Sequence, residues 1–176
     1  MFALDGRRLM KRRLVVMRHA KSSWKSSAAT DHERPLNARG RRAAPLVGAR
    51  LVELGWAPEV VLSSDSARTR ETLERMQPIL SAGAKVHYSR DLYLAGIEEI
   101  REQLRLVPPE VTVLLILGHN PGFEEFVTWL SGEEVTLKTA SAALLVGRGE
   151  DWEASLLHSS AWNLVSIIRA RELEPR

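Results

Sequence analysis

Cysteine is absent from this 176-residue sequence, so disulfide bonds, thiolate catalysis and cysteine-ligated zinc are all excluded. No apolar run approaches the roughly 18 residues that a membrane-spanning helix needs. Residues 1–13 are basic, yet they lack the apolar segment of about 7–15 residues that a secretory signal contains. These absences fit a cytoplasmic protein, and we expect no membrane partner.

Most of the chain has no excess of positive charge, although the sequence pI is about 9.6. Residues 1–13 contain five basic side chains and one acidic side chain, which gives them a net charge of +4. Because the whole chain carries +3, residues 14–176 have a net charge of −1. The basicity therefore belongs to an N-terminal tail, residues 1–13, ahead of a single domain, residues 14–176. With that domain close to neutral, we expect no nucleic-acid partner.

Short apolar runs alternate with longer amphipathic segments, which is typical of a layered α/β fold. The predicted strands are residues 14–17, 59–62, 85–88 and 111–117, followed by an antiparallel hairpin of residues 142–147 and 152–157. The predicted helices are residues 38–54, a segment that residues 63–65 cap and that ends near residue 80, then residues 97–106 and 123–130. Residues 164–171 fit either a strand or a helix.

Two of the predicted strands end close to a histidine. Residues 14–17 run directly into Arg18-His19, and residues 113–117 are followed, one residue later, by His119. If the two strands are parallel neighbours, both imidazoles lie at the same edge of the sheet. Open α/β sheets bind their ligands beyond the carboxyl ends of the strands, so this edge is the candidate site. The other histidines lack this context and are expected to be ordinary polar residues: His32, His87 and His158.

Two further arginines occupy positions suited to an anion. Arg68 follows the strand 59–62 near the start of a helix, and a helix N-terminus itself favours negative charge. Arg34 precedes Pro35, which keeps the chain extended and can stiffen a loop over a pocket. A solvated surface position is the expected place for the following arginines: Arg39, Arg41, Arg42 and Arg70.

Together these histidines and arginines form a set suited to a dianionic phosphoryl group. The planar fork of arginine binds two oxygens at once. Phosphoryl transfer requires mainly positioning and charge stabilisation, together with a nucleophile, and a neutral imidazole is a competent nucleophile. No cluster of Asp or Glu accompanies the histidines, which argues against a catalytic metal. A Walker-type glycine loop is also missing, which excludes a P-loop nucleotidase.

Four short motifs follow one another along the chain. They are Arg18-His19-Ala20, Arg34-Pro35-Leu36, Ser63–Thr69 with Arg68, and Gly118-His119-Asn120-Pro121. In this order they resemble the histidine phosphatase superfamily and, within it, the SixA-type phosphohistidine phosphatases. The resemblance covers the chain from about Leu14 to Val165. It implies an α/β fold, a three-layer α/β/α sandwich with a mainly parallel central sheet, of the phosphoglycerate mutase-like kind.

The resemblance also implies a role for each site residue. His19 would be the nucleophile and would form a phosphohistidine enzyme intermediate that water then hydrolyses. Arg18, Arg34 and Arg68 would bind the phosphoryl oxygens. His119 would bind the phosphoryl group as well and would stabilise charge that develops in the transition state. No metal and no organic cofactor are implied.

The sequence departs from the superfamily pattern in two places. Ala20 stands where the signature has glycine, which adds a methyl group and removes the freedom to adopt a positive φ. Phosphomonoesterase and mutase branches also place an acidic proton donor after the third strand. In this chain Tyr93 is nearest to that position, whereas Asp91 and Glu98 are expected to be solvated surface residues.

The missing acid bears on the choice of substrate. An alkoxide leaving group gains about 10²–10⁴-fold from a positioned acid, whereas the imidazole of phosphohistidine is a far better leaving group. The pattern therefore favours hydrolysis of phosphohistidine in a phosphotransfer protein, so that a phosphorylated protein is the expected partner. Two alternatives stay open: a phosphomonoesterase that acts on a phosphorylated small molecule, and a non-catalytic phosphate-binding regulatory module.

Overall fold

A computed structural model of the protein describes residues 8–80 and 83–175. Its centre is a six-stranded sheet in the order β3-β2-β4-β1-β5-β6. The strands are β1 (Met10–Arg18), β2 (Val60–Ser64), β3 (Lys85–Ser89), β4 (Val113–Gly118), β5 (Ser141–Gly149) and β6 (Asn163–Arg169). The four strands from β3 to β1 are parallel, whereas β5 runs antiparallel to both β1 and β6. The predicted mainly parallel sheet is confirmed.

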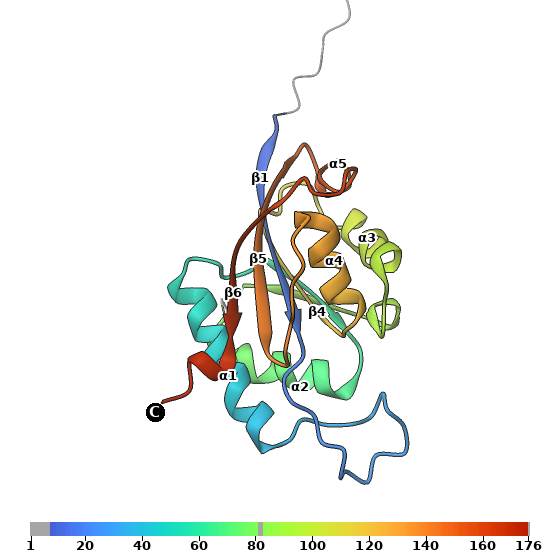
Figure 1. Cartoon of the computed structure of the whole chain (residues 1–176), viewed down its shortest axis with the longest axis vertical. Coiled ribbons are helices and arrows are strands. Elements are labelled where there is room, and N and C mark those ends of the chain that lie inside the picture. Colours follow the sequence, from blue (N-terminus) through green and yellow to red (C-terminus); the bar gives the residue numbers. More distant parts are fainter. Residues whose placement is uncertain (1–7, 81–82, 176) are drawn as a thin grey trace, which may run out of the picture.

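Helices cover both faces of this sheet (Figure 1). They are α1 (Ala38–Glu53), α2 (Ala67–Met76), α3 (Ile97–Arg105), α4 (Gly122–Ser131) and α5 (Trp152–Ser155), with short 3-10 turns η1 (Arg90–Leu92) and η2 (Ala170–Glu172). Alternate residues of β1 point to opposite faces, as in any strand. Val15 and Met17 pack with α1 and α2, whereas Leu14 and Val16 pack with α3, α4 and α5. The result is the three-layer α/β/α sandwich that the sequence predicted.

The first strand begins at Met10, four residues before the predicted strand. Lys11, Arg12 and Arg13 pair with β5 as part of the sheet, although the sequence pattern placed them in a basic tail. Arg12 is fully buried, and its guanidinium donates to the carbonyls of Val111 at 2.7 Å and Glu150 at 2.6 Å. Residues 1–7 of the predicted tail lie outside the described residues. The strand boundary was wrong because an arginine that is buried against backbone carbonyls looks, in sequence, like a solvated one.

The C-terminal hairpin was predicted with the wrong second strand. Residues 152–157 contain the short helix α5, and the strand that pairs with β5 is β6. Asp151 caps α5 by accepting from the backbone N–H of Ala154 at 2.7 Å. Trp152 and Leu156, four residues apart, are both buried in one core cluster, which is helical spacing. The undecided segment 164–171 is strand up to Arg169 and a 3-10 turn after it.

No helix within the two described ranges is long and apolar enough to span a membrane.

Replacing Arg12 is expected to destabilise the fold. Arg12→Met keeps the length of the side chain but leaves buried carbonyls without their donors, so we expect a loss of about 2–4 kcal/mol in the free energy of unfolding. Urea denaturation followed by circular dichroism measures this loss. Lys11→Met, at an exposed position of the same strand, is the matched control and is expected to change stability by less than about 0.5 kcal/mol. Equal effects of the two substitutions would show that the contacts of Arg12 contribute nothing.

Candidate active site

The candidate site lies at the carboxyl ends of β1, β2 and β4. Because β1 and β4 are parallel neighbours with Arg18 opposite Gly118, the residues that follow the two strands emerge together. The rings of His19 and His119 have their centroids 5.2 Å apart. The parallel pairing predicted from the sequence is therefore confirmed, and it places both histidines at one point of the sheet edge.

A cavity of about 220 Å³ opens at this point. All five predicted site residues line it, from β1, the loop before α1, the start of α2 and the end of β4: Arg18, His19, Arg34, Arg68 and His119. The remaining lining residues are Lys21, Ser22, Trp24, Asp31, Leu94, Asn120 and Thr139. The structure thus assembles the whole predicted set, while the catalytic roles of its members stay predictions.

His19 is almost fully buried and has a defined tautomer. Its Nδ1 lies 2.7 Å from the carbonyl oxygen of Ala20, so Nδ1 carries the proton and donates it to that oxygen. Nε2 then presents a lone pair, which accepts from Nε of Arg68 at 3.3 Å. Burial, together with the positive charges of Arg68, Arg18 and Arg34, lowers the pKa of His19 to about 3. His19 is therefore a neutral imidazole with Nε2 available at physiological pH.

His119 is also held neutral, with the opposite tautomer. Its Nε2 lies 2.8 Å from the hydroxyl of Ser64, while Nδ1 accepts from Nη2 of Arg68 at 3.3 Å. Since Arg68 can only donate, the proton of His119 is on Nε2 and points to Ser64. Burial above all, together with the neighbouring His19 and Arg68, lowers the pKa of His119 to about 2. A dianion in the cavity opposes all of these causes and favours protonation.

Arg68 connects the two histidines. It belongs to the first turn of α2 and is only 3% exposed. Besides its contacts with both imidazoles, it donates from Nη1 to the carbonyl of Asp31 at 2.6 Å and from Nη2 to the carboxylate of the same residue at 3.0 Å. Such saturation fixes the guanidinium plane before any ligand arrives.

Arg18 and Arg34 also line the cavity, and each is held by contacts of its own. Arg34 donates from Nε to Asp31 at 2.9 Å and stacks on Trp24, with its Cζ 3.5 Å from the ring centroid. Arg18 donates from Nη1 to the carbonyl of Leu137 at 3.0 Å. Its Nε is buried without a hydrogen-bond partner among the residues that the structure describes. A buried donor of this kind lacks an acceptor that a phosphoryl oxygen can supply.

Asp31 is the site residue that sequence reasoning missed. Its carboxylate contacts Arg34 and Arg68 and accepts from the hydroxyl of Tyr93 at 2.6 Å. The hydrogen bond from Tyr93 and the two guanidinium groups lower the pKa of Asp31 to about 2, against a smaller effect of burial. Its place three residues before Arg34 was the signal available, but the contacts with Arg68 and Tyr93 come from distant segments.

The segment after the third strand, where the superfamily pattern has an acid, brings no carboxyl group to the cavity. Tyr93 packs the edge of its ring against His119, with centroids 5.3 Å apart, and its pKa is raised by burial and by Asp31. Asp91 accepts from Gln103 and Glu98 pairs with Arg101, both outside the cavity, as the surface prediction required. His32, predicted to be an ordinary polar residue, does not line the cavity but packs against Tyr93 behind it. It lies 2.7 Å from Asp65, with its ring 4.8 Å from that of Tyr93.

The alanine in the Arg-His-Ala motif fits its position. Ala20 is not among the described residues with positive φ, so its methyl group causes no backbone strain. Its N–H donates to the hydroxyl of Thr72 at 3.0 Å. The departure from glycine therefore leaves the geometry of His19 intact. In the described part of the chain, no group of three or more His, Asp or Glu residues is arranged to hold a metal ion.

Comparison with known proteins agrees with this geometry. The model of the histidine phosphatase superfamily (branch 1) matches residues 14–93. An uncharacterized chloroplastic protein of Arabidopsis thaliana is 37% identical over 178 residues, covering 95% of this chain and 82% of that protein. A structure from Nakamurella multipartitia, assigned as a SixA phosphohistidine phosphatase, superposes with a TM-score of 0.80 and 30% identity, covering 91% of this chain and 96% of that one. A mycobacterial glucosyl-3-phosphoglycerate phosphatase superposes with a TM-score of 0.65 and 18% identity, over 89% and 98% of the two chains.

The sheet order, the two helical layers and the histidine pair at the carboxyl edge define a protein of the phosphoglycerate mutase-like architecture. The chain belongs to the histidine phosphatase superfamily. Both the fold and the family predicted from the sequence are thus confirmed.

Folding stability is expected to fall as the medium becomes more acidic than about pH 6.5, the ordinary pKa of histidine. The folded state holds the pKa of His19 near 3 and that of His119 near 2, so only the unfolded chain takes up protons there. Each histidine then lowers stability by about 1.4 kcal/mol per pH unit over this window. Urea unfolding at a series of pH values measures the slope.

The matched variants for this slope are His19→Asn with His119→Asn, and His158→Asn as the exposed control. The double variant is expected to lose stability less steeply with acid than the wild type, whereas the control follows the wild type. Parallel slopes for all three proteins would contradict the neutral, buried state of the two site histidines.

Proposed function

We propose that the protein is a phosphatase that works through phosphorylation of His19. The observation that carries this proposal is the unprotonated Nε2 of a neutral, buried His19, which accepts only a long hydrogen bond from Arg68 in a cavity that Arg18 and Arg34 also line. Nε2 attacks the phosphorus atom, a new P–N bond forms, and the bond to the leaving group breaks. Water then attacks the phosphorus of phospho-His19, releasing phosphate and restoring the imidazole.

The arginines match the charge of the transferring group. In a loose phosphoryl-transfer transition state the negative charge is spread over three equatorial oxygens. Arg18 brings an unpaired Nε–H to these oxygens, while Arg34 and Arg68 bring guanidinium groups that are already oriented by Asp31. His119 becomes protonated in the field of the bound dianion and donates to the phosphoryl group. Positioned charge, rather than further covalent chemistry, supplies the catalysis.

The leaving group we propose is the imidazole of phosphohistidine. Asp31 is the carboxyl group that lines the cavity, and its pKa near 2 keeps it ionised and unable to act as a general acid at neutral pH. The hydroxyl of Tyr93 is engaged by Asp31, and its pKa is raised rather than lowered toward neutrality. A leaving group that departs without a strong acid suits this site. The substrate is then a phosphotransfer protein that carries phosphohistidine, and no metal or organic cofactor takes part.

The likeness to the Nakamurella structure supports this choice, since that protein is assigned to the SixA phosphohistidine phosphatases. The second candidate function is that of a small-molecule phosphomonoesterase. The fold that the chain shares with the mycobacterial glucosyl-3-phosphoglycerate phosphatase supports this candidate. A regulatory module without activity is the weakest candidate, because both histidines and all three arginines line one cavity. The cytoplasmic location stays a prediction from the sequence. The relative from Arabidopsis is described as chloroplastic, which is a property of that protein.

Substrate preference is the direct test of the proposal. A histidine-phosphorylated carrier protein is expected to be dephosphorylated at least about 100-fold more efficiently, in kcat/KM, than a panel of sugar phosphates, because the esters need an acid that the cavity lacks. Release of phosphate from both kinds of substrate measures the ratio. His19→Ala is the control and is expected to abolish both turnover and the acid-labile phosphoenzyme. Preference for the esters would reassign the protein as a small-molecule phosphatase.

The shape of Arg68, and not only its charge, is expected to matter for turnover. Arg68→Lys keeps one positive charge but loses the fork that contacts His19, His119 and Asp31, so we expect kcat/KM to fall by about 100-fold. Arg70→Lys, two residues further along the same helix, on a different face and outside the cavity, is the matched control and should stay near the wild type. A small effect of Arg68→Lys would contradict the assigned role.

A further inference from the structure

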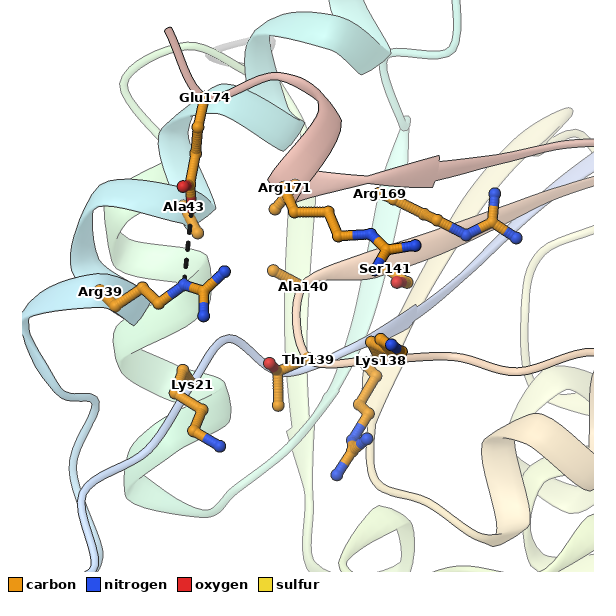
Figure 2. A pocket seen from close by; sticks show the side chains of 12 residues that line it. Lys21, Arg39, Ala43, Lys138, Thr139, Ala140, Ser141, Arg169, Arg171 and Glu174 are labelled. Atoms are coloured by element: carbon orange, nitrogen blue, oxygen red, sulfur yellow. Dashed lines mark ion pairs between the residues drawn. The ribbon is translucent and has the colours of Figure 1, made fainter. Parts of the chain in front are cut away.

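A second cavity, of about 310 Å³, lies beside the catalytic one. It is bounded by the loop after β1, the start of α1, the loop before β5 and the chain beyond β6 (Figure 2). Arg18, Lys21 and Thr139 line both cavities. The two spaces are therefore neighbours that share a wall.

The walls of this basic cavity carry an unusual concentration of positive charge. Six of its lining residues are basic: Arg18, Lys21, Arg39, Lys138, Arg169 and Arg171. Glu174 is the one acidic residue that lines it, and its carboxylate is 3.6 Å from Arg39. Since residues 14–176 sum to −1, this charge is a local feature and not the average of the surface.

Most of these cations are free. Within residues 8–80 and 83–175, the side chains of Lys21, Lys138, Arg169 and Arg171 form no ion pair and no hydrogen bond. Figure 2 shows them, with Arg39, placed around Thr139 and Ala140. Like charges gathered in a concave space repel one another unless an anion lies among them. The cavity therefore has the electrostatic properties of an anion site.

The backbone joins this cavity to the nucleophile. Ala140 has a φ of 57°, a left-handed conformation that is unfavourable for alanine. In that conformation its N–H donates to the carbonyl of His19 at 3.0 Å. An anion held in the basic cavity therefore lies one shared wall away from a phosphoryl group held at His19.

The surroundings indicate a protein rather than a small molecule as the carrier of this anion. Lys21, Lys138 and Arg171 are exposed, so they reach outward instead of closing over a ligand. At the mouth of the catalytic cavity, Trp24 is 79% exposed and Leu94 is 58% exposed. Exposed tryptophan and arginine together are typical of protein–protein contact sites, whereas small ligands are mostly enclosed.

We propose that the basic cavity binds aspartate or glutamate side chains that flank the phosphohistidine of the partner protein. This inference rests on the proposed function, because it assigns the region of the substrate next to the phosphoryl group. Arg169, Arg171 and Lys138 receive the carboxylates, while Arg18 lies between them and the phosphoryl group. The site thereby selects phosphoproteins that are acidic around the modified histidine.

Two histidine-phosphorylated peptides that differ only in having glutamate or glutamine around the phosphohistidine test this inference. The wild type is expected to hydrolyse the glutamate peptide about 10-fold more efficiently, in kcat/KM, at low salt. The triple variant Lys138→Gln, Arg169→Gln, Arg171→Gln is expected to lose this preference while its rate on the glutamine peptide is unchanged. A charge-matched triple variant at the far end of the sheet, Lys11→Gln, Lys85→Gln, Arg148→Gln, is expected to keep the preference.

Equal rates of the wild type on the two peptides would overturn the inference. The inference would also be overturned if the triple variant lost hydrolysis of a sugar bisphosphate but hydrolysed both peptides as the wild type does. The basic cavity would then bind a small molecule. Binding of the unphosphorylated peptides to His19→Ala, measured by calorimetry, gives a readout without turnover. If neither phosphopeptide is hydrolysed but the glutamate peptide binds more tightly through Lys138, Arg169 and Arg171, the proposed function fails and the acidic-partner site stands.

Discussion

The site depends first on the parallel register between β1 and β4. With Arg18 opposite Gly118, the N–H of His19 donates to the carbonyl of Gly118 at 3.1 Å, and the two histidines must leave the sheet side by side. Gly118 also admits no side chain, because a Cβ there would lie 2.3 Å from the ring of Phe123. A slip of one residue would turn every side chain of the strand to the other face. Backbone hydrogen bonding therefore sets the distance between the rings of His19 and His119.

Around the two imidazole rings, positively charged arginines are paired with one negatively charged carboxylate, Asp31. Burial, together with the charges of Arg68 and Arg18, keeps both histidines neutral, and Arg34 acts in the same direction on His19. Asp31 offsets part of the arginine charge and orients Arg34 and Arg68 by hydrogen bonds to both. A phosphoryl group that enters must share these guanidinium groups with Asp31. The arginines therefore favour both the neutral state of His19, to which burial contributes most, and the ionised state of Asp31, to which the hydrogen bond from Tyr93 contributes most.

The sequence predicted the part of this arrangement that depends on where the strands end. Apolar runs that stop at Arg18-His19 and before His119 indicate a sheet edge. Parallel pairing brings residues at this edge together, and it does not depend on the conformation of the connecting loops. Contacts between loops leave no such pattern, so the contacts of Asp31 with Arg68 and Tyr93 could not be predicted, although its spacing from Arg34 was visible in the sequence. Arg12 was misplaced because its partners are backbone carbonyls, which any sequence supplies. The helix α5 was mistaken for a strand because one helical turn is too short to show its period.

The two ends of the chain differ in their distance from the site. β1 begins at one end of the sheet, and the last described residues, which follow β6, lie toward the other (Figure 1). Among those last residues, Arg171 and Glu174 line the basic cavity (Figure 2). A surface tether or reporter fused ahead of β1 leaves the approach to both cavities open. The same attachment after Glu174 crowds the mouth of the basic cavity. Immobilisation through the N-terminal side is therefore the orientation in which a captured molecule still presents its site to solution.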